Sequence, residues 1–483
     1  MNWDTVIGLE VHVQLNTKTK LFSHAETSFG AGANSHTTAL DQGHPGTLPV
    51  LNREALRKAI QAGLALHCTI NEYSRFDRKN YFYPDLPKAY QISQYHHPIC
   101  SKGWLEISVN DPKRGEYARK IHLTRIHLEE DAGKLVHGQG GAVAESYVDL
   151  NRAGTPLIEI VSEPELTSAL EAVAYLQKLR SILLYLGVSD CNMEEGSLRC
   201  DANISLKPEG SSALGNRTEI KNMNTFKGLL AAVEYEVRRQ QRVLEGGGKV
   251  ETETLLFDPV ERKTRSMRSK EDAHDYRYFP EPDLPPVLVG KDQVDAIAAA
   301  LPELPDAKRD RYQKDFGLSL YDADVLVSEK PMASYFEAAV AAFPAEPKKI
   351  CNWITTEIAG TLNEGNRSIE TFPVKPEALG ELVRLVSEGA ITGKIAKELF
   401  AEMIATGKRP ADLVKEKGIQ VISDDGALRA ICERLIRENP DPVAKYRGGN
   451  KNALGFFVGA VMKETKGQAN PKSVNQILAE LLK

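Results

Sequence analysis

Carboxylate, imidazole and amide side chains recur at alternating positions in several short stretches of this sequence. In residues 8–15, Glu10, His12 and Gln14 alternate with apolar residues. Successive side chains of a strand point to opposite faces, so these three polar side chains share one face. Hard divalent cations prefer oxygen ligands and tolerate an imidazole. The pattern therefore predicts a sheet that lines a divalent-cation site, with Glu10 and His12 on one ion.

A second segment of the same kind covers residues 125–130. Here Glu129 is in phase with Arg125 and His127, whereas Glu130 falls on the other face of the strand. We therefore expect Glu129 to be a ligand and Glu130 to have a supporting, structural role.

Two further segments add polar groups of the same types. Asp201 shares a strand face with Asn203, and Glu219 shares one with Lys221. The alternative is a network of salt bridges within the sheet, but a buried carboxylate without a cation is costly, which favours a metal at Glu10 and His12. The predicted catalytic residues are Glu10, His12, Glu129, Asp201, Glu219 and Lys221, and the predicted metal ligands are Glu10, His12, Glu129 and Glu219.

The elements that must position these residues form an α+β region over residues 1–292, with a mixed and largely antiparallel sheet. Turn residues separate the short strands, and the periodicity predicts helices at 53–67, 169–186 and 225–245. Thr225 is the expected N-cap of the last helix. The proline-rich segment 279–286 ends the region.

From about residue 293 the pattern becomes helical. We expect a helical domain over 293–408 and a helical tail domain over 409–483, separated at the break Gly407–Pro410. The expected helices are 292–301, 305–316, 319–326, 332–342, 350–362, one from 379, 394–405, 427–439, 453–463 and 471–483.

Composition limits the class of protein. A chain of 483 residues with a net charge of −5 is long enough for several domains and carries no general attraction for nucleic acid. Its six cysteines form no CxxC pair, which fits reduced thiols. The first residues have no signal-peptide pattern, and no run of ~18 apolar residues occurs. We therefore expect a cytoplasmic protein with no membrane contact.

Eight segments carry a resemblance to a known family. The chain resembles, over essentially its whole length, the B subunits of the bacterial aspartyl/glutamyl-tRNA(Asn/Gln) amidotransferase, a heterotrimer. The segments are IGLEVHVQL at 7–15, RKNYFYPDLPK and YQISQ within 78–94, HLEEDAGK at 127–134, DLNRAGTPLIEI at 149–160, GSLRCDANI at 196–204, EIKNMN at 219–224 and HDYRYFPEPD at 274–283.

The resemblance implies a cradle-shaped N-terminal kinase and transamidase domain, a helical domain and a YqeY-like tail that binds tRNA. It implies a carbon–nitrogen ligase that uses ATP and Mg²⁺ to convert the side-chain carboxylate of Glu-tRNA(Gln) or Asp-tRNA(Asn) to an acyl phosphate. Ammonia then replaces the phosphate. The implied partners are the amidase A subunit, which releases ammonia from glutamine, the small C subunit and the misacylated tRNA.

The sequence departs from the family at one place. Many members carry zinc-binding cysteines where this chain has Ser23, Ala25, Thr38 and Asp41. Without thiolates a closed tetrahedral site is not expected, so we predict no zinc. The alternative is a replacement site built from the nearby His24, His36 and His44.

ATP binding lacks its common sequence signatures. The chain has neither a Gly-x-x-x-x-Gly-Lys-Ser/Thr loop nor a Gly-x-Gly-x-x-Gly turn after a strand. The aromatic run 81–83 could stack on adenine or on the terminal base of tRNA, or could be the core and rim of one strand. Basic residues near the carboxylate segments are the expected ATP contacts, namely Lys79, Lys88, Arg152, Arg199, Arg268 and Lys270.

The tail contains a basic stretch. Residues 445–472 contain six Lys or Arg residues and a single acidic residue, Glu464. Arg447 and Lys451 flank a glycine-rich loop that could fit a phosphate backbone, so we predict that they contact tRNA. The alternative is a helical hairpin whose exposed face happens to be basic.

Three functions are compatible with these patterns. The leading hypothesis is a catalytic amidotransferase subunit, and its main rival is a non-catalytic scaffold that only binds tRNA. A scaffold has no need for the carboxylate and imidazole faces. A stand-alone ligase that uses free ammonia is disfavoured by the long helical half. Because no cysteine has a nucleophile setting and no Gly-Ser-Ser amidase signature occurs, the chain needs a partner to make ammonia.

Overall fold

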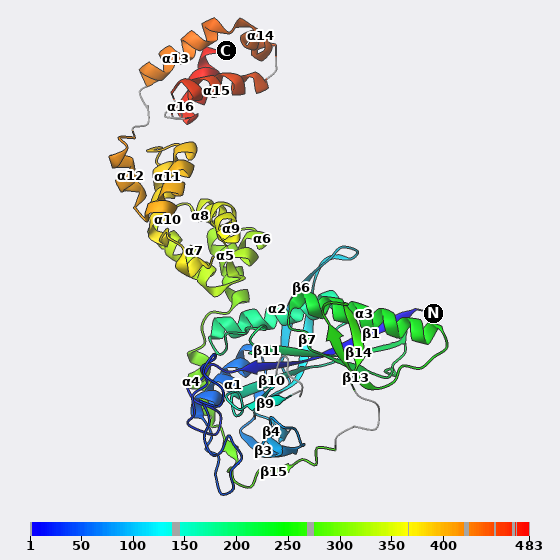
Figure 1. The fold of residues 1–483 in the computed structure, drawn as a ribbon. Coiled ribbons are helices and arrows are strands. Elements are labelled where there is room, and N and C mark those ends of the chain that lie inside the picture. Colours follow the sequence, from blue (N-terminus) through cyan, green and yellow to red (C-terminus); the bar gives the residue numbers. More distant parts are fainter. Residues whose placement is uncertain are drawn as a thin grey trace. The chain divides into compact units, whose positions relative to one another are not determined.

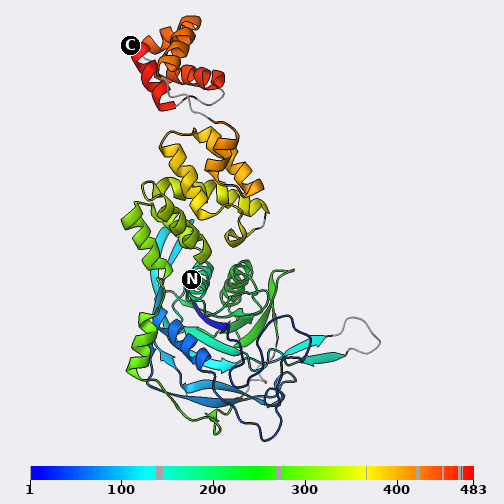
Figure 2. The same ribbon diagram turned by 90° about the vertical axis from the view of Figure 1, so that its left-hand side faces the viewer.

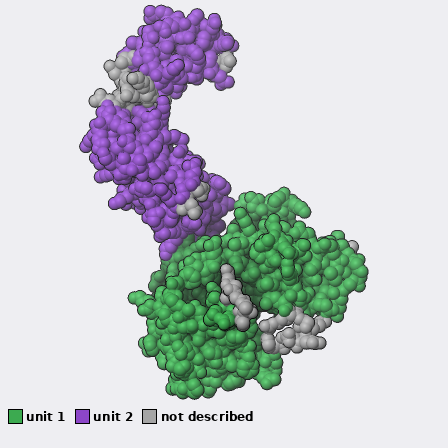
Figure 3. Space-filling model, in the orientation of Figure 1, with its two compact units in different colours: residues 1–304 green, residues 305–483 purple. Residues whose placement is uncertain are grey.

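The computed structural model describes residues 2–137, 145–267, 275–365, 367–419, 425–448, 451–465, 469 and 471–482. The chain divides into two compact units, residues 1–304 and residues 305–483 (Figure 3). The first unit combines sheets and helices, and the described part of the second is helical. The predicted α+β class is therefore confirmed.

The first unit is built on a large mixed sheet. Among the described residues it has ten strands in the order β14-β13-β12-β11-β1-β10-β7-β5-β2, with β6 paired to β7. Only β12 and β13 pair in parallel within this sheet. Its strands are β1 (Trp3–Gln14), β2 (Thr69–Ile70), β5 (Cys100–Ser101), β6 (Trp104–Asp111), β7 (Gly115–Glu130), β10 (Pro156–Ser162), β11 (Leu198–Pro208), β12 (Thr218–Lys221), β13 (Glu253–Asp258) and β14 (Lys263–Ser266).

Two smaller sheets accompany it. Strand β3 (Tyr73–Asn80) pairs with β4 (Tyr90–His97), β15 (Phe279–Pro280) and β16 (Val287–Leu288), and β4 packs against β7. Strand β8 (Lys134–His137) pairs with β9 (Ser146–Asp149).

The described residues of the first unit form four helices: α1 (Arg53–Ala65), α2 (Ala169–Leu186), α3 (Phe226–Glu245) and α4 (Lys291–Ala299). Helices α2 and α3 pack on one face of the large sheet, and the strands β3 and β4 lie on its other side (Figure 1). Helices α1 and α4 lie side by side (Figures 1 and 2). Thr225 accepts a hydrogen bond from the Gly228 amide, which confirms it as the N-cap of α3.

The apolar face of β1 explains this layering. Ile7, Leu9, Val11 and Val13 are fully buried beneath the helices, as the alternating pattern requires. The opposite face of the same strand carries Glu10, His12 and Gln14, which are only partly buried. One strand therefore contributes both to the core and to the polar surface on which the candidate site is built.

In the part of the second unit that the structure describes, buried residues form two hydrophobic clusters, one within 312–413 and one within 428–482. The helix predicted at 350–362 is interrupted by the π-helix η2 (Ile354–Ile358). The helices of this unit are α5 (Pro305–Phe316), α6 (Leu320–Val327), α7 (Lys330–Ala342), α8 (Pro347–Trp353), α9 (Ala359–Gly365), η3 (Ile369–Thr371), α10 (Pro376–Ser387), α11 (Gly393–Thr406), α12 (Pro410–Glu416), α13 (Asp425–Glu438), α14 (Pro440–Arg447), η4 (Lys451–Ala453), α15 (Leu454–Glu464) and α16 (Pro471–Leu481).

The expected break Gly407–Pro410 is a turn between two packed helices. Gly407 is the left-handed C-cap of α11 and Pro410 is the first residue of α12. Leu413 of α12 is fully buried in the cluster of 312–413. The predicted division at residues 292 and 408 stays a prediction, and the break between the two clusters falls after α12.

In the ranges that the structure covers, no helix combines the length and the apolar character that are needed to cross a membrane.

Candidate active site

The predicted catalytic residues lie on neighbouring strands of the large sheet. His12 of β1 is directly opposite Glu159 of β10 on one side and Arg199 of β11 on the other. Directly opposed residues of antiparallel strands point to the same face. Two more pairs extend this face, Glu10 with Asp201 and Glu159 with His127. Residues from distant segments of the sequence thus form one continuous polar surface.

His12, Glu129 and Glu159 form a group of potential metal ligands on this surface. Each offers one ligand atom, and these atoms lie within 4.8 Å of one another. His12 Nε2 is 3.3 Å from Glu159 Oε2, and His127 Nε2 lies 3.4 Å from Glu129 Oε2 and 3.6 Å from Glu159 Oε2. An imidazole with two carboxylates is a suitable ligand set for a hard divalent cation.

The surroundings keep this group charged. Burial acts to raise the pKa of Glu129, but the hydrogen bond and charge of His127 outweigh it and lower the pKa. Burial also opposes ionisation of Glu159, yet His127 and His12 hold the pKa of that carboxyl well below its usual range. For His12, burial lowers the pKa and contact with Glu159 raises it, with a net rise. Both carboxylates are therefore ionised at neutral pH.

Two of the four predicted metal ligands lie outside this group. Glu10 accepts a hydrogen bond from Asn203 at 2.9 Å, and burial together with the charges of Glu159 and Glu219 raises its pKa. Glu219 lies on β12, where its carboxylate is 2.9 Å from the Lys221 ammonium and accepts a hydrogen bond from Thr254. The predicted ligand roles of Glu10 and Glu219 stay predictions.

The predicted catalytic residue Lys221 joins a second group. Its ammonium lies between Asp201, at 2.6 Å, and Glu219. Burial lowers the pKa of Lys221, but the two carboxylates outweigh burial and raise it. This lysine is therefore a fixed positive charge at neutral pH rather than a base.

Arg199 is held beside the group of His12, Glu129 and Glu159 by Asp131. Its Nη2 donates to Asp131 at 2.9 Å, and Gln14 donates to the same carboxylate at 2.7 Å. The Nε atom of Arg199 is buried without a hydrogen-bond partner among the described residues. Arg199 is therefore oriented at the site while one of its donors remains unused.

Arg152 has a different environment from Arg199. It lies 3.7 Å from Asp131, but it donates mainly to the backbone oxygens of Ala132 and Gly133. Its guanidinium therefore holds the segment that follows β7.

The remaining predicted ATP contacts also differ from one another. Lys79 lies over the Tyr276 ring at 4.9 Å, and its charge lowers the pKa of both Glu129 and Glu159. The described residues include no carboxylate within ion-pair distance of Lys79, whereas Lys88 is paired with the buried Glu130. Arg268 and Lys270 lie outside the described residues.

Of the predicted stacking residues, Tyr81 is largely covered, while Phe82 is 87% exposed and Tyr83 48% exposed. Phe82 and Tyr83 are thus accessible to a base, and stacking by this aromatic run stays a prediction.

Glu159 and Asp131 were not among the predicted site residues, although both occur in segments that resemble the family. Glu159 is the single charged residue of the apolar strand β10, and Asp131 follows Glu129 and Glu130 directly. An isolated carboxylate in an otherwise buried strand is itself a signal, because its charge needs a partner.

The four positions at which the resemblance implies zinc-binding cysteines in many members are joined by hydrogen bonds here. Asp41 accepts from the hydroxyls of Ser23, at 3.0 Å, and Thr38, at 2.9 Å, and it lies 3.6 Å from the buried ammonium of Lys20. The fourth position, Ala25, donates its backbone N–H weakly to Ser23 Oγ. A polar cluster thus stands where the thiolates would be.

The two predicted tRNA contacts lie in the second unit. Arg447 ends α14 and is exposed, and Lys451 begins η4, with its side chain outside the described part of the structure.

Comparisons with known proteins show what the chain is similar to. A family model described as the GatB/GatE catalytic domain matches residues 5–295, and one described as the GatB domain matches residues 334–482. Three similar proteins each carry the name of the B subunit of aspartyl/glutamyl-tRNA(Asn/Gln) amidotransferase. They come from Geotalea daltonii (54% identity) and Persephonella marina (52%), both over the full length of both chains, and Geobacillus kaustophilus (52%, over 99% of each). The chain therefore belongs to the family of B subunits of the tRNA-dependent amidotransferase.

Proposed function

We propose that the first unit transfers a phosphoryl group from ATP to the side-chain carboxylate of Glu-tRNA(Gln) or Asp-tRNA(Asn). The observation that supports this most is the group of His12, Glu129 and Glu159 on the polar face of the large sheet. A carboxylate is a poor electrophile because its leaving group would be oxide. Phosphorylation gives an acyl phosphate, from which phosphate can leave.

His12, Glu129 and Glu159 are the residues that would hold Mg²⁺, with Glu10 next to them on β1. The donor set fits, since it joins two ionised carboxylates to one imidazole, and His12 keeps 20% of its side chain exposed. When bound, the cation would neutralise charge on the phosphoryl oxygens.

The chain's own cations have the complementary role. Lys79 and Arg199 present positive charge to the phosphates of ATP and to the substrate carboxylate, two anions that repel each other. Asp131 already orients Arg199, so the guanidinium needs little reorganisation during the reaction. Asp201, Glu219 and Lys221 extend the catalytic surface. Lys88, Arg152, Arg268 and Lys270 complete the proposed ATP contacts, although Lys88 and Arg152 contribute mainly to structure in this arrangement.

Ammonia must come from a partner. Attack of ammonia on the acyl phosphate forms the C–N bond, breaks the C–O bond to phosphate and yields the amide. All six cysteines of this chain are buried, and burial raises the pKa of Cys191 to about 11 and that of Cys68 to about 12. Such thiols are poor nucleophiles. We infer that an amidase A subunit supplies the ammonia and that a small C subunit completes a cytoplasmic heterotrimer.

The exposed Arg447 supports tRNA binding by the tail, with Lys451 as the second predicted contact. A scaffold that only binds tRNA is the less favoured alternative, because it gives no reason to gather three ionisable groups from three strands.

The test is a His12→Ala variant in the assembled complex. We expect tRNA-dependent ATP cleavage to be lost, while glutamine hydrolysis by the partner and complex assembly persist. His44→Ala, at an exposed histidine, is the matched control. Wild-type ATP turnover in the His12→Ala complex would reject the proposal.

A further inference from the structure

The first residues of β1 leave one edge of that strand open. Strand β1 pairs with β11 along most of its length, but it pairs with β10 only from Glu10 onward, apart from the bridge between Ile7 and Leu166. Both the N–H and the C=O of Ile7 bond to Leu166. Backbone groups of a strand alternate in direction, so Thr5 and Trp3 turn theirs toward the same edge. Among the described residues nothing bonds to them there, and an open edge of this kind can pair with a strand of another chain.

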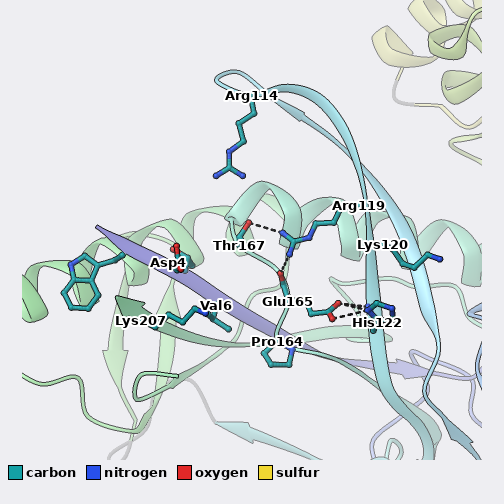
Figure 4. Close-up of a pocket in the computed structure, with 12 residues that line it drawn as sticks. Asp4, Val6, Arg114, Arg119, Lys120, His122, Pro164, Glu165, Thr167 and Lys207 are labelled. Carbon is teal, nitrogen blue, oxygen red and sulfur yellow. Dashed lines mark hydrogen bonds and ion pairs between the residues drawn. The ribbon is translucent and has the colours of Figure 1, made fainter. Parts of the chain in front are cut away.

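Two pockets meet at this edge. One of about 780 Å³ lies on the face of β1 that carries Asp4, beside the β6–β7 hairpin (Figure 4). The other, of about 470 Å³, lies beside α2 and α3 on the opposite face. Thr5 and Thr167 line both pockets. Because successive side chains of a strand point to opposite faces, a strand added at this edge would place its side chains in the two pockets in turn.

The pocket beside the hairpin is cationic. Arg119 is neutralised by Glu171 at 2.9 Å, and His122 contacts Glu165 at 3.0 Å. Against the remaining cations the described lining offers one further carboxylate, Asp4, so the pocket has a net positive charge that suits acidic side chains. The basic residues of the lining that have no carboxylate within ion-pair distance among the described residues are Arg114, Lys120 and Lys207.

The pocket beside the helices has a different character. Leu170 of α2 and Val233 and Val237 of α3 contribute to its lining, so it suits apolar side chains. The charged members of the lining balance one another, two acidic and two basic, namely Asp111, Glu234, Lys113 and Arg238.

We propose that an extended segment of a partner protein, with acidic and apolar residues in alternation, binds beside residues 3–6 as an additional strand of the large sheet. Backbone hydrogen bonds to Trp3 and Thr5 supply affinity, and the two pockets select the alternating side chains. A nucleic-acid strand would also be attracted by the cations, but it has no apolar side chains for the second pocket and no peptide groups for the edge. The inference is independent of the proposed function, because it needs neither ATP nor a reacting carboxylate.

The experiment titrates synthetic peptides into the full-length chain by isothermal titration calorimetry. The probe is a heptapeptide in which glutamate and valine alternate. The control peptide has the same composition, but its glutamates are grouped together, so that it cannot serve both pockets. We expect the alternating peptide to bind about tenfold more tightly than the control, with an affinity that falls as salt is added.

Two sets of variants test the edge and the cations separately. Thr5→Pro removes the N–H that faces the open edge and none of the ladder to β11, so it should weaken binding of the alternating peptide about tenfold. Thr5→Val keeps that N–H and should bind as wild type. Arg114→Glu with Lys207→Glu should weaken binding about tenfold and remove most of its salt dependence. Lys227→Glu with Lys249→Glu makes the same charge change at exposed sites and should leave the affinity near wild type.

Three outcomes would overturn the proposal. The first is equal affinity for the two peptides, including no binding of either. The second is unchanged binding of the alternating peptide by Thr5→Pro. The third is that Arg114→Glu with Lys207→Glu weakens binding of tRNA and leaves that of the peptide unchanged, which would assign the cations to nucleic acid.

Discussion

At the residue scale, Glu159 is the part of the candidate site with the clearest chemical consequence. It contacts both His12 and His127, and it completes the only group of three potential ligands found in the described residues. Glu159→Gln keeps the shape but removes the charge. We expect the complex to bind Mn²⁺, used as a probe for Mg²⁺, about 10–100-fold more weakly, which is roughly the loss of affinity when a metal site loses a supporting group. Electron paramagnetic resonance of free Mn²⁺ measures this affinity. Glu106→Gln, on an exposed position of β6, is the control; equal affinities in both variants would contradict the site.

Asp41 gives a second prediction at this scale. Its carboxylate lies 3.6 Å from the ammonium of Lys20, whose side chain is fully buried. Burial lowers the pKa of Lys20, and Asp41 opposes that shift. Asp41→Asn keeps the size but leaves a buried cation uncompensated, so we expect the free energy of unfolding to fall by about 3–5 kcal/mol. Denaturant unfolding measures it, and Lys20→Met in the same background should recover much of the loss.

The same cluster bears on zinc. Asp41 and the hydroxyls of Ser23 and Thr38, with the neighbouring Lys20, already satisfy one another where the resemblance implies cysteines. We therefore expect elemental analysis of the purified chain to find well below one equivalent of zinc. A stoichiometric ion that resists chelation would instead point to a site built from His24, His36 and His44.

At the element scale, Glu337 of α7 joins that helix to α5. Its carboxylate contacts Lys308 at 2.6 Å and also Arg311. Burial raises the pKa of Glu337, but these cations outweigh burial and lower it. A folded pKa below the unfolded value of about 4.3 gives stability that is present above that pH and is lost as pH falls through the folded pKa. Glu337→Gln should therefore reduce the free energy of unfolding at pH 7 by about 1 kcal/mol. This loss should appear as a lower Tm.

The pH dependence is the distinguishing readout. The Tm difference between wild type and Glu337→Gln should shrink as the pH falls below about 4, because the wild-type carboxyl then becomes neutral too. Glu370→Gln, at an exposed position, should show no difference at either pH. A difference that stays constant with pH would mean that packing, not charge, joins the two helices.

Element by element, the sequence predicts what depends on local pattern. The bounds of α2 and α5 and the N-cap Thr225 are confirmed, as is the polar face shared by Glu10 and His12. The helices α12 and α14 were not predicted. Both are short and begin with proline, which breaks a helix in its interior but is favourable at the first helical position.

Cross-strand neighbours could not be predicted from one sequence. That His12 meets Glu159 depends on which strands pair and in what register, and both are set by tertiary packing. The same applies to cations. Lys79 and Lys88 belong to one segment and look equivalent in the sequence, yet Lys88 has a buried carboxylate partner and Lys79 has none among the described residues. Local pattern therefore identifies candidate residue types, and the fold decides which of them meet.

At the scale of the whole molecule, the two hydrophobic clusters of the second unit decide where the tail can be removed. A variant that ends at Ile419 keeps every buried residue of the cluster 312–413, whereas one that ends at Gly407 loses Leu413. We therefore expect the variant ending at Ile419 to keep the wild-type Tm of the remaining chain. The variant ending at Gly407 should unfold at a lower temperature. Its free energy of unfolding should fall by about 2–5 kcal/mol, because the loss of Leu413 exposes the hydrophobic cluster that it covers.

The function of the same variants tests the tRNA-binding role of the tail. With the variant ending at Ile419 in the complex, amide formation on charged tRNA should collapse, while glutamine hydrolysis without tRNA persists. Arg447→Glu in the full chain should weaken binding of tRNA and lower its salt dependence, because the substitution replaces a predicted phosphate contact with a negative charge. Full amidation efficiency in the shortened complex would make the tail a packing element and leave the first unit as the sole surface for tRNA recognition.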